Sequence, residues 1–99
     1  MARIMAGTAT VSNAGTRVQL SNTKDRVLSL FILAQPDNAG NLYFGDSAVA
    51  ANAGVTLPVG KPFSVDIAKA EKDGSVVFDK FYVDSATNGD KLDWFAVVA

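Results

Sequence analysis

The side chains that could do chemistry in this chain are carboxylates, amides and hydroxyls, because it contains neither cysteine nor histidine. Without those two residues, Ser–His or Cys–His nucleophilic pairs and thiolate metal sites cannot be built. A Ser–Lys or paired-carboxylate site would remain chemically feasible. Five of the ten carboxylates, however, fall in segments typical of turns, namely Asp25, Asp37, Glu71, Asp73 and Asp90. Turn carboxylates usually bond nearby backbone, so we predict no enzymatic activity and no cofactor.

Two clusters of oxygen-bearing side chains could be compared with calcium sites. They are Asp37, Asn38, Asn41 and Asp46, and Asp84, Asn88 and Asp90. The first does not match the spacing of an EF-hand loop, and both contain few carboxylates. Asp and Asn also hydrogen-bond their own backbone two residues on. We therefore predict turn hydrogen bonding rather than metal binding at both clusters.

Aromatic side chains could instead form a sugar-binding platform or a subunit contact. Three adjacent pairs occur, Tyr43-Phe44, Phe81-Tyr82 and Trp94-Phe95. Neighbours in a strand point to opposite faces, so one member of each pair must leave the core side. Phe95 and Val97 lie on the phase opposite Trp94, as Tyr82 opposes Phe81. Such residues either are covered by the segment 34–60 or meet a partner, and the sequence leaves both alternatives open.

The elements that must position these side chains are short strands separated by turns. Strand-like runs are predicted at 9–12, 16–20, 26–34, 42–44, 61–68, 75–84 and 91–98. Asp73-Gly74 and Asn88-Gly89 predict hairpins, and the run at 26–34 is apolar enough to be covered on both faces. We predict a single all-β domain over 9–99, a small antiparallel β-sandwich (jelly-roll-like) or partly open barrel, preceded by an N-terminal arm at 1–8.

The composition disfavours some classes of binding partner. Hydrophobic residues make up 48% of the chain and charged residues 19%, against roughly 25% charged in typical domains. The surface is therefore sparsely charged, and part of it is expected to serve for contact. Nine basic residues against ten acidic ones, with no basic run, disfavour nucleic acid. No stretch approaches the ~20 apolar residues of a membrane span, so no membrane partner is expected.

The segment 34–60 carries a pattern, A-x-P-x-N-x-G-N-x-Y-x-G followed by G-x-x-L-x-x-G. The residues in it are Ala34, Pro36, Asn38, Gly40, Asn41, Tyr43, Gly45, Gly54, Leu57 and Gly60. Together with the aromatic strand and Asn-Gly-Asp turn at 82–92, it resembles small virion proteins of tailed bacteriophages over residues 16–98. The resemblance implies a β-sandwich subunit present in many copies on the capsid shell, at the head–tail junction or in the tail.

We therefore expect a capsid decoration (cement) subunit of the virion, assembled in the host cytoplasm. It would form a homo-oligomer, a trimer being favoured, and would contact the major capsid protein or other virion subunits through apolar surfaces. Candidate contact residues are Met1, Ile4, Met5, Tyr82, Phe95 and Val97. The alternatives are a head–tail or tail-associated subunit, or a module that binds a host surface or polysaccharide.

Overall fold

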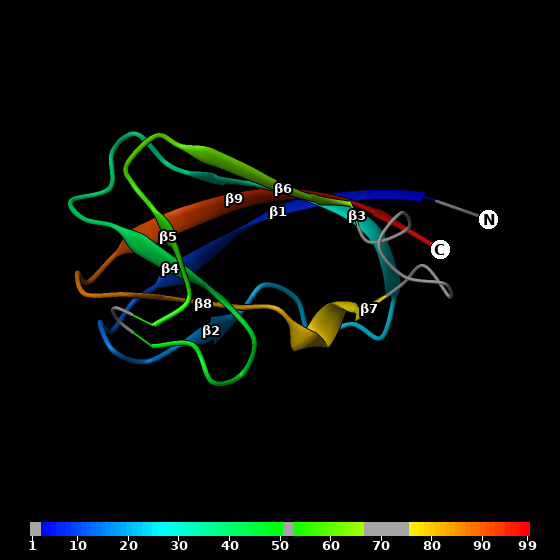
Figure 1. Cartoon of the computed structure of the whole chain (residues 1–99), viewed down its shortest axis with the longest axis horizontal. Helices are drawn as coiled ribbons and strands as arrows, with labels where there is room; N and C mark the ends of the chain where they lie inside the picture. The colour runs from blue at the N-terminus through cyan, green and yellow to red at the C-terminus, as the bar shows by residue number, and fades with distance from the viewer. Residues whose placement is uncertain (1–2, 51–52, 67–75) are drawn as a thin grey trace.

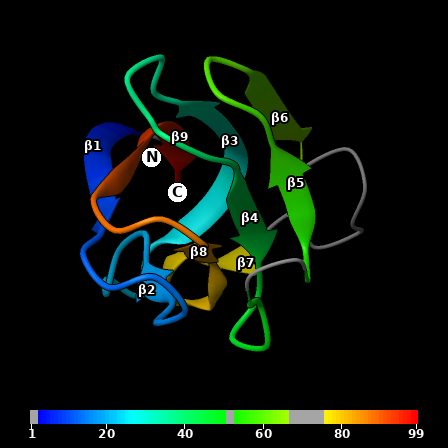
Figure 2. The same ribbon diagram turned by 90° about the vertical axis from the view of Figure 1, so that its left-hand side faces the viewer.

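The computed structural model describes residues 3–50, 53–66 and 76–99, which form a sandwich of two antiparallel sheets (Figures 1 and 2). The larger sheet has the order β1 (Arg3–Val11), β9 (Asp90–Val98), β3 (Arg26–Ala34), β6 (Pro62–Asp66), and β7 (Val76–Val77) also pairs with β3. The smaller sheet has the order β2 (Val18–Gln19), β8 (Tyr82–Ser85), β4 (Leu42–Gly45), β5 (Val55–Leu57). A 3-10 turn, η1 (Phe78–Lys80), lies between β7 and β8. The predicted all-β sandwich is confirmed, and these strands do not close a barrel.

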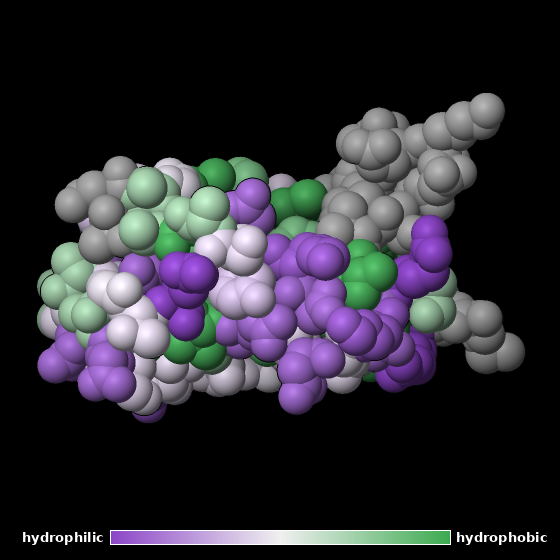
Figure 3. All heavy atoms as spheres, turned by 90° about the horizontal axis from the view of Figure 1, so that it is seen from below, coloured by the Kyte–Doolittle hydropathy of each residue, from purple (hydrophilic) through white to green (hydrophobic). Residues whose placement is uncertain are grey.

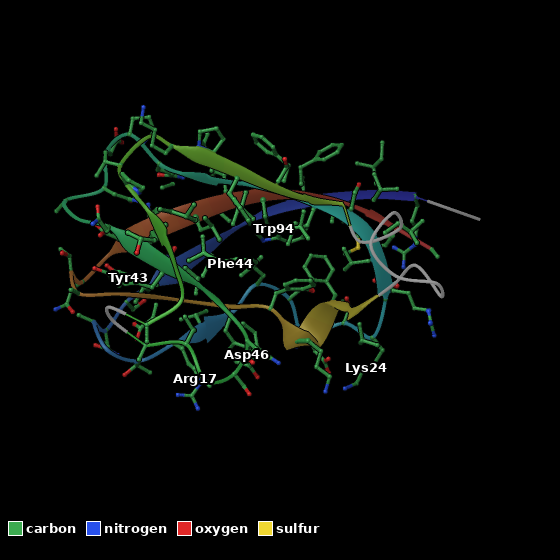
Figure 4. The ribbon with its side chains drawn as sticks, in the orientation of Figure 1. Arg17, Lys24, Tyr43, Phe44, Asp46 and Trp94 are labelled. Carbon is green, nitrogen blue, oxygen red and sulfur yellow. The ribbon has the colours of Figure 1, made fainter. Side chains whose placement is uncertain are left out.

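The core lies between the two sheets and is set by the alternation of β9. Leu92, Trp94, Ala96 and Val98 are buried, as the sequence phase predicts. Phe44 reaches toward this layer from the smaller sheet (Figure 4). The Phe78 ring meets Trp94 edge-on with centroids 4.8 Å apart. These contacts bury the large aromatic surfaces that dominate core energetics.

Gly7 lets β1 lie close to the indole of Trp94. The two residues are directly opposite each other in the β1–β9 register. A Cβ placed on Gly7 would lie 2.7 Å from Cζ2 and 2.9 Å from Cε2 of Trp94. The strand can approach this ring only because position 7 has no side chain.

The structure differs from the sequence prediction in three strands, β1, β2 and β3. Residues 3–8 of the predicted arm belong to β1, because β9 supplies nine consecutive pairing partners that extend the strand from Val11 back to Arg3. Met1 lies outside the described residues. The prediction that 26–34 is covered on both faces is wrong, because Phe31 is 43% exposed, although the bounds of this strand are confirmed. The predicted strand at 16–20 shortens to β2.

Two further predictions fail around β8. The predicted strand 75–84 is interrupted by η1, where Phe78 turns into the core and its backbone N–H donates to the carbonyl of Asp25. The Asn88-Gly89 turn is not a hairpin, because β8 and β9 belong to different sheets. Gly89 has a φ of 85°, so the turn uses the left-handed region as expected, but it connects two layers. The Asp73-Gly74 turn lies outside the described residues.

Candidate functional site

An apolar patch covers part of the outer face of the larger sheet. We define this outer patch as Ile4 and Ala6 of β1, Phe31 and Leu33 of β3, and Phe95 and Val97 of β9. Its most exposed large side chains are Ile4 at 67%, Phe95 at 44% and Phe31 at 43%. The outer face of a sandwich sheet normally carries polar side chains, so this grouping of exposed apolar side chains is unusual and makes the patch a candidate site.

The sheet register makes the outer patch continuous. Ala6 pairs with Phe95, and Phe95 pairs with Phe31, which places these three side chains in one row across β1, β9 and β3. Ile4 pairs with Val97 in the adjacent row. Directly opposed residues in an antiparallel pair have Cβ atoms about 4.5–5.5 Å apart. The patch therefore spans three neighbouring strands rather than gathering isolated residues.

The opposite side of the molecule differs in character. Seen from the side of β2, β8 and η1, the surface is largely hydrophilic (Figure 3). Lys24 and Asp79 form an ion pair there. The lysine holds the pKa of Asp79 below its usual value, mainly through the hydrogen bond and also through its charge, whereas burial opposes the shift.

The structure separates the predicted contact residues. Ile4, Phe95 and Val97 lie together in the outer patch. Met5 points to the other face of β1 and packs against the core, as alternation with Ile4 requires. Tyr82 lies half-buried on β8, in the smaller sheet. Met1 is outside the described residues.

Segment 34–60 does not cover the outer patch. Its strands, β4 and β5, belong to the smaller sheet, on the other side of the core from the exposed face of β9. The exposure of Phe95 follows from this arrangement. Of the two alternatives that the sequence left open, coverage by this segment is wrong for Phe95, and contact with a partner remains a proposal.

Buried carboxylates at one end of the sandwich hold loops through hydrogen bonds to backbone N–H groups. Asp90 is 3% exposed, and its oxygens accept hydrogen bonds from the backbone N–H groups of Ala39 at 2.9 Å and Gly40 at 3.2 Å. Its Oδ2 also accepts from Oγ of Ser85 at 3.0 Å. Asp84 Oδ1 accepts from the N–H of Gly15 at 3.1 Å. The bonds to Ala39, Gly40 and Gly15 reach distant segments, where the sequence predicted local turn bonding.

Three other members of the two clusters, Asn38, Asn88 and Asp46, also bond backbone. Asn38 accepts from the N–H of Lys91 and donates to its carbonyl, both at 2.8 Å. Asn88 accepts from the N–H of Ala14 at 2.7 Å. Asp46 accepts from the N–H of Ala48, two residues on, at 2.9 Å. Within the described ranges, no group of three or more potential metal-binding acidic, His or Cys side chains comes together.

Two grooves border the smaller sheet. A polar groove of about 330 Å³ is lined by Gln19, Asp46, Ser47, Asp79, Lys80 and Tyr82. An apolar groove of about 270 Å³ is lined by Val55 of the end strand β5 and Phe63 of the end strand β6, and also by Phe44 and Phe81. The rings of Phe44 and Phe81 stack on each other with centroids 5.8 Å apart. The sequence identified Tyr82 as an exposed aromatic but did not predict either groove, because each combines residues distant in the chain.

Comparisons with protein-family models, curated proteins and solved structures find no match to this chain. In the part of the chain that the structure describes, no helix has the length and apolar character needed to cross a membrane.

Proposed function

We propose that this protein is a structural subunit of a tailed-bacteriophage virion, a decoration or cement protein that packs on the capsid shell in many copies. The outer patch is the observation that supports this proposal. It offers a neighbouring subunit an apolar sheet face bearing Phe31 and Phe95 at 43% and 44% exposure. The virion itself is inferred from the resemblance carried by segments 34–60 and 82–92.

The size of the outer patch suits a passive stabilising role. An aromatic side chain contributes 150–250 Å² when buried, so Phe95 at 44% exposure has roughly 90 Å² left to bury. At about 25 cal/mol per Å², burying this area of Phe95 would contribute ~2 kcal/mol of binding free energy for each copy. A contribution of this size is modest for one contact. Repeated over a shell, it would oppose the outward pressure of a packaged genome.

Purified particles from the cells that produce this chain provide the test. Mass spectrometry should find the chain in a fixed high ratio to the major capsid protein, and electron microscopy should place its larger sheet against another subunit. Particles assembled with a Phe95→Ser variant should carry fewer copies of the chain than particles with the natural chain. A matched Val55→Ser variant should keep the natural occupancy, because Val55 is equally exposed, at 42%, but lies on the smaller sheet. Particles without this chain, or equal occupancy by both variants, would contradict the proposal.

A second candidate function is saccharide binding at the polar groove, as on a host surface. Its lining combines the ring of Tyr82 with the carboxylate of Asp46 and the amide of Gln19, groups that together can stack on a sugar and bond its hydroxyls. Glycan-array binding by the isolated protein, lost in Tyr82→Ala and retained in Phe95→Ser, would favour this function. An array without signal for the unmodified chain would exclude the sugars tested.

A further inference from the structure

The outer edge of β1 is a long, regular strand edge. β1 runs for nine residues and, among the described strands, pairs with β9 alone. Every second residue of an edge strand directs its backbone amide and carbonyl away from the sheet, where another strand can pair with them. No register shift interrupts the β1–β9 ladder from Arg3 to Val11.

This edge lacks the features that usually prevent sheets from joining. Proline, lysine, bulges and shortness are the common protections of edge strands. The end strands of the smaller sheet, β2 and β5, have two and three residues, and β6 begins with Pro62. β1 has neither proline nor lysine, and its one charged side chain, Arg3, forms an ion pair with Asp25. Among the end strands that the structure describes, β1 is the longest and the least protected.

We propose that β1 pairs with β1 of a second copy of this chain, antiparallel, across a two-fold axis centred on Gly7. This register pairs all nine residues, with Arg3 opposite Val11 and Ala6 opposite Thr8 of the second copy. It places no like charges opposite each other, because Arg3 is the one charged residue in the strand. The contact is isologous, so each copy uses the same edge. This inference rests on the proposed function, because a shell that carries many copies is where two β1 edges would meet.

Pairing at this edge would join two larger sheets into one. Opposed residues of an antiparallel pair share a face, so Ala6 and Thr8 of both copies stay on the outer side, and Met5 and Ala9 stay on the core side. The outer patches of the two copies then lie on one continuous surface. The contact between two strand edges is small, so the dimer is weak in dilute solution. A shell that holds many copies close together raises their effective concentration and favours the pairing.

Disulfide trapping in the full chain tests the register, because the natural sequence has no cysteine. Single variants Ala6→Cys and Thr8→Cys are purified separately, mixed and oxidised with a glutathione buffer. Directly opposed strand residues have Cα atoms 4.5–5.5 Å apart, within the range that a disulfide bridges. The mixture should form cross-linked dimers about ten times faster than either variant alone, because the two thiols are held at high effective concentration.

A mixture of Ala6→Cys with Ser64→Cys is the matched control. Ser64 lies on the same sheet opposite Phe31, but on β6 at the other edge. Preferred cross-linking of this mixture would mean head-to-tail pairing of β1 with β6 and would overturn the proposal, as would equal rates in all mixtures. Sedimentation of the unmodified chain over a concentration series should show a monomer–dimer equilibrium, and a trimer would also overturn it.

Hydrogen exchange of the unmodified chain gives a reading that depends on no variant. The outward amides of β1 should become protected as concentration rises, and unchanged exchange would count against the pairing. The outcomes separate the two proposals. Loss of cross-linking with normal shell occupancy rejects the edge contact alone. Efficient cross-linking of a chain that is absent from particles rejects the virion function and leaves the edge contact standing.

Discussion

Adding one methyl group at Gly7 should destabilise the sandwich through its contact with Trp94. The new Cβ would lie 2.7 Å and 2.9 Å from two ring carbons, closer than side-chain Cβ atoms approach. The ring cannot easily retreat, because Phe78 meets it edge-on at 4.8 Å. Overpacking of this kind costs about 1–3 kcal/mol. Replacing glycine by alanine regains about 0.4–1 kcal/mol through the unfolded chain, so Gly7→Ala should lower the free energy of unfolding by about 1–2 kcal/mol.

Urea unfolding followed by the emission of the single tryptophan, Trp94, measures this effect directly. Gly45→Ala is the matched control, because Gly45 also lies in a strand and its Cβ would meet Val49 at an ordinary 3.5 Å. The control should be neutral or slightly stabilising. If Gly7→Ala unfolds at the same urea concentration as the natural chain, with unchanged emission, then β1 does not lie against the indole and the reasoning is refuted.

Two other predictions concern carboxylates. Asp90→Ala should lower the free energy of unfolding by about 2–4 kcal/mol, because it leaves the part-buried N–H of Gly40 and other donors without an acceptor. Urea unfolding measures this change. As a control, Asp37→Ala, at an exposed position, should change the free energy of unfolding by less than about 0.5 kcal/mol. Lys24→Ala should raise the pKa of Asp79 toward its ordinary value of 3.8, which NMR titration of the carboxyl measures. Because the pKa of Asp79 is lowered in the folded state, its pairing with Lys24 stabilises the fold above pH 3.8, and this stabilisation is lost as pH falls through the folded-state pKa. A stability difference between the natural chain and the variant that persists at lower pH would contradict the assignment.

Strand periodicity predicts much of this fold, and the assignment of strands to sheets is what it leaves out. The bounds of β3 match the predicted run at 26–34, and β9 extends the predicted run at 91–98 by one residue. An Asn-Gly turn, by contrast, satisfies its own backbone equally well whether it joins neighbours in one sheet or crosses to the other. Here the chain crosses, and the buried carboxylates of Asp84 and Asp90 bond segments far away in the sequence. Long-range bonds of this kind have no local signal.

The outer patch is only partly predictable from the sequence, because it depends on which strands pair. Alternation along one strand identifies Phe95 and Val97 as facing away from the core, but only the pairing of β9 with β3 brings Phe31 beside Phe95. The apolar run at 26–34 did not predict the exposure of Phe31, because a strand covered on both faces and a strand with an apolar exposed face have similar sequences. The prediction of an arm at 1–8 included no strand alternation, so it did not predict that Ile4 and Met5 point to opposite faces of the sheet.

The edge and the face of the larger sheet can serve one assembly together because they use different parts of it. Edge pairing engages backbone groups of β1 in the plane of the sheet, whereas the side chains of the outer patch point perpendicular to that plane. Joining two copies at their edges therefore leaves both patches available. Ile4, at 67% the most exposed large apolar side chain among the described residues, lies on β1, which carries both the edge and part of the patch. In such a pair, the apolar surface offered to the proposed shell would be doubled before any contact with the shell forms, so a weak edge contact would strengthen the binding of each face.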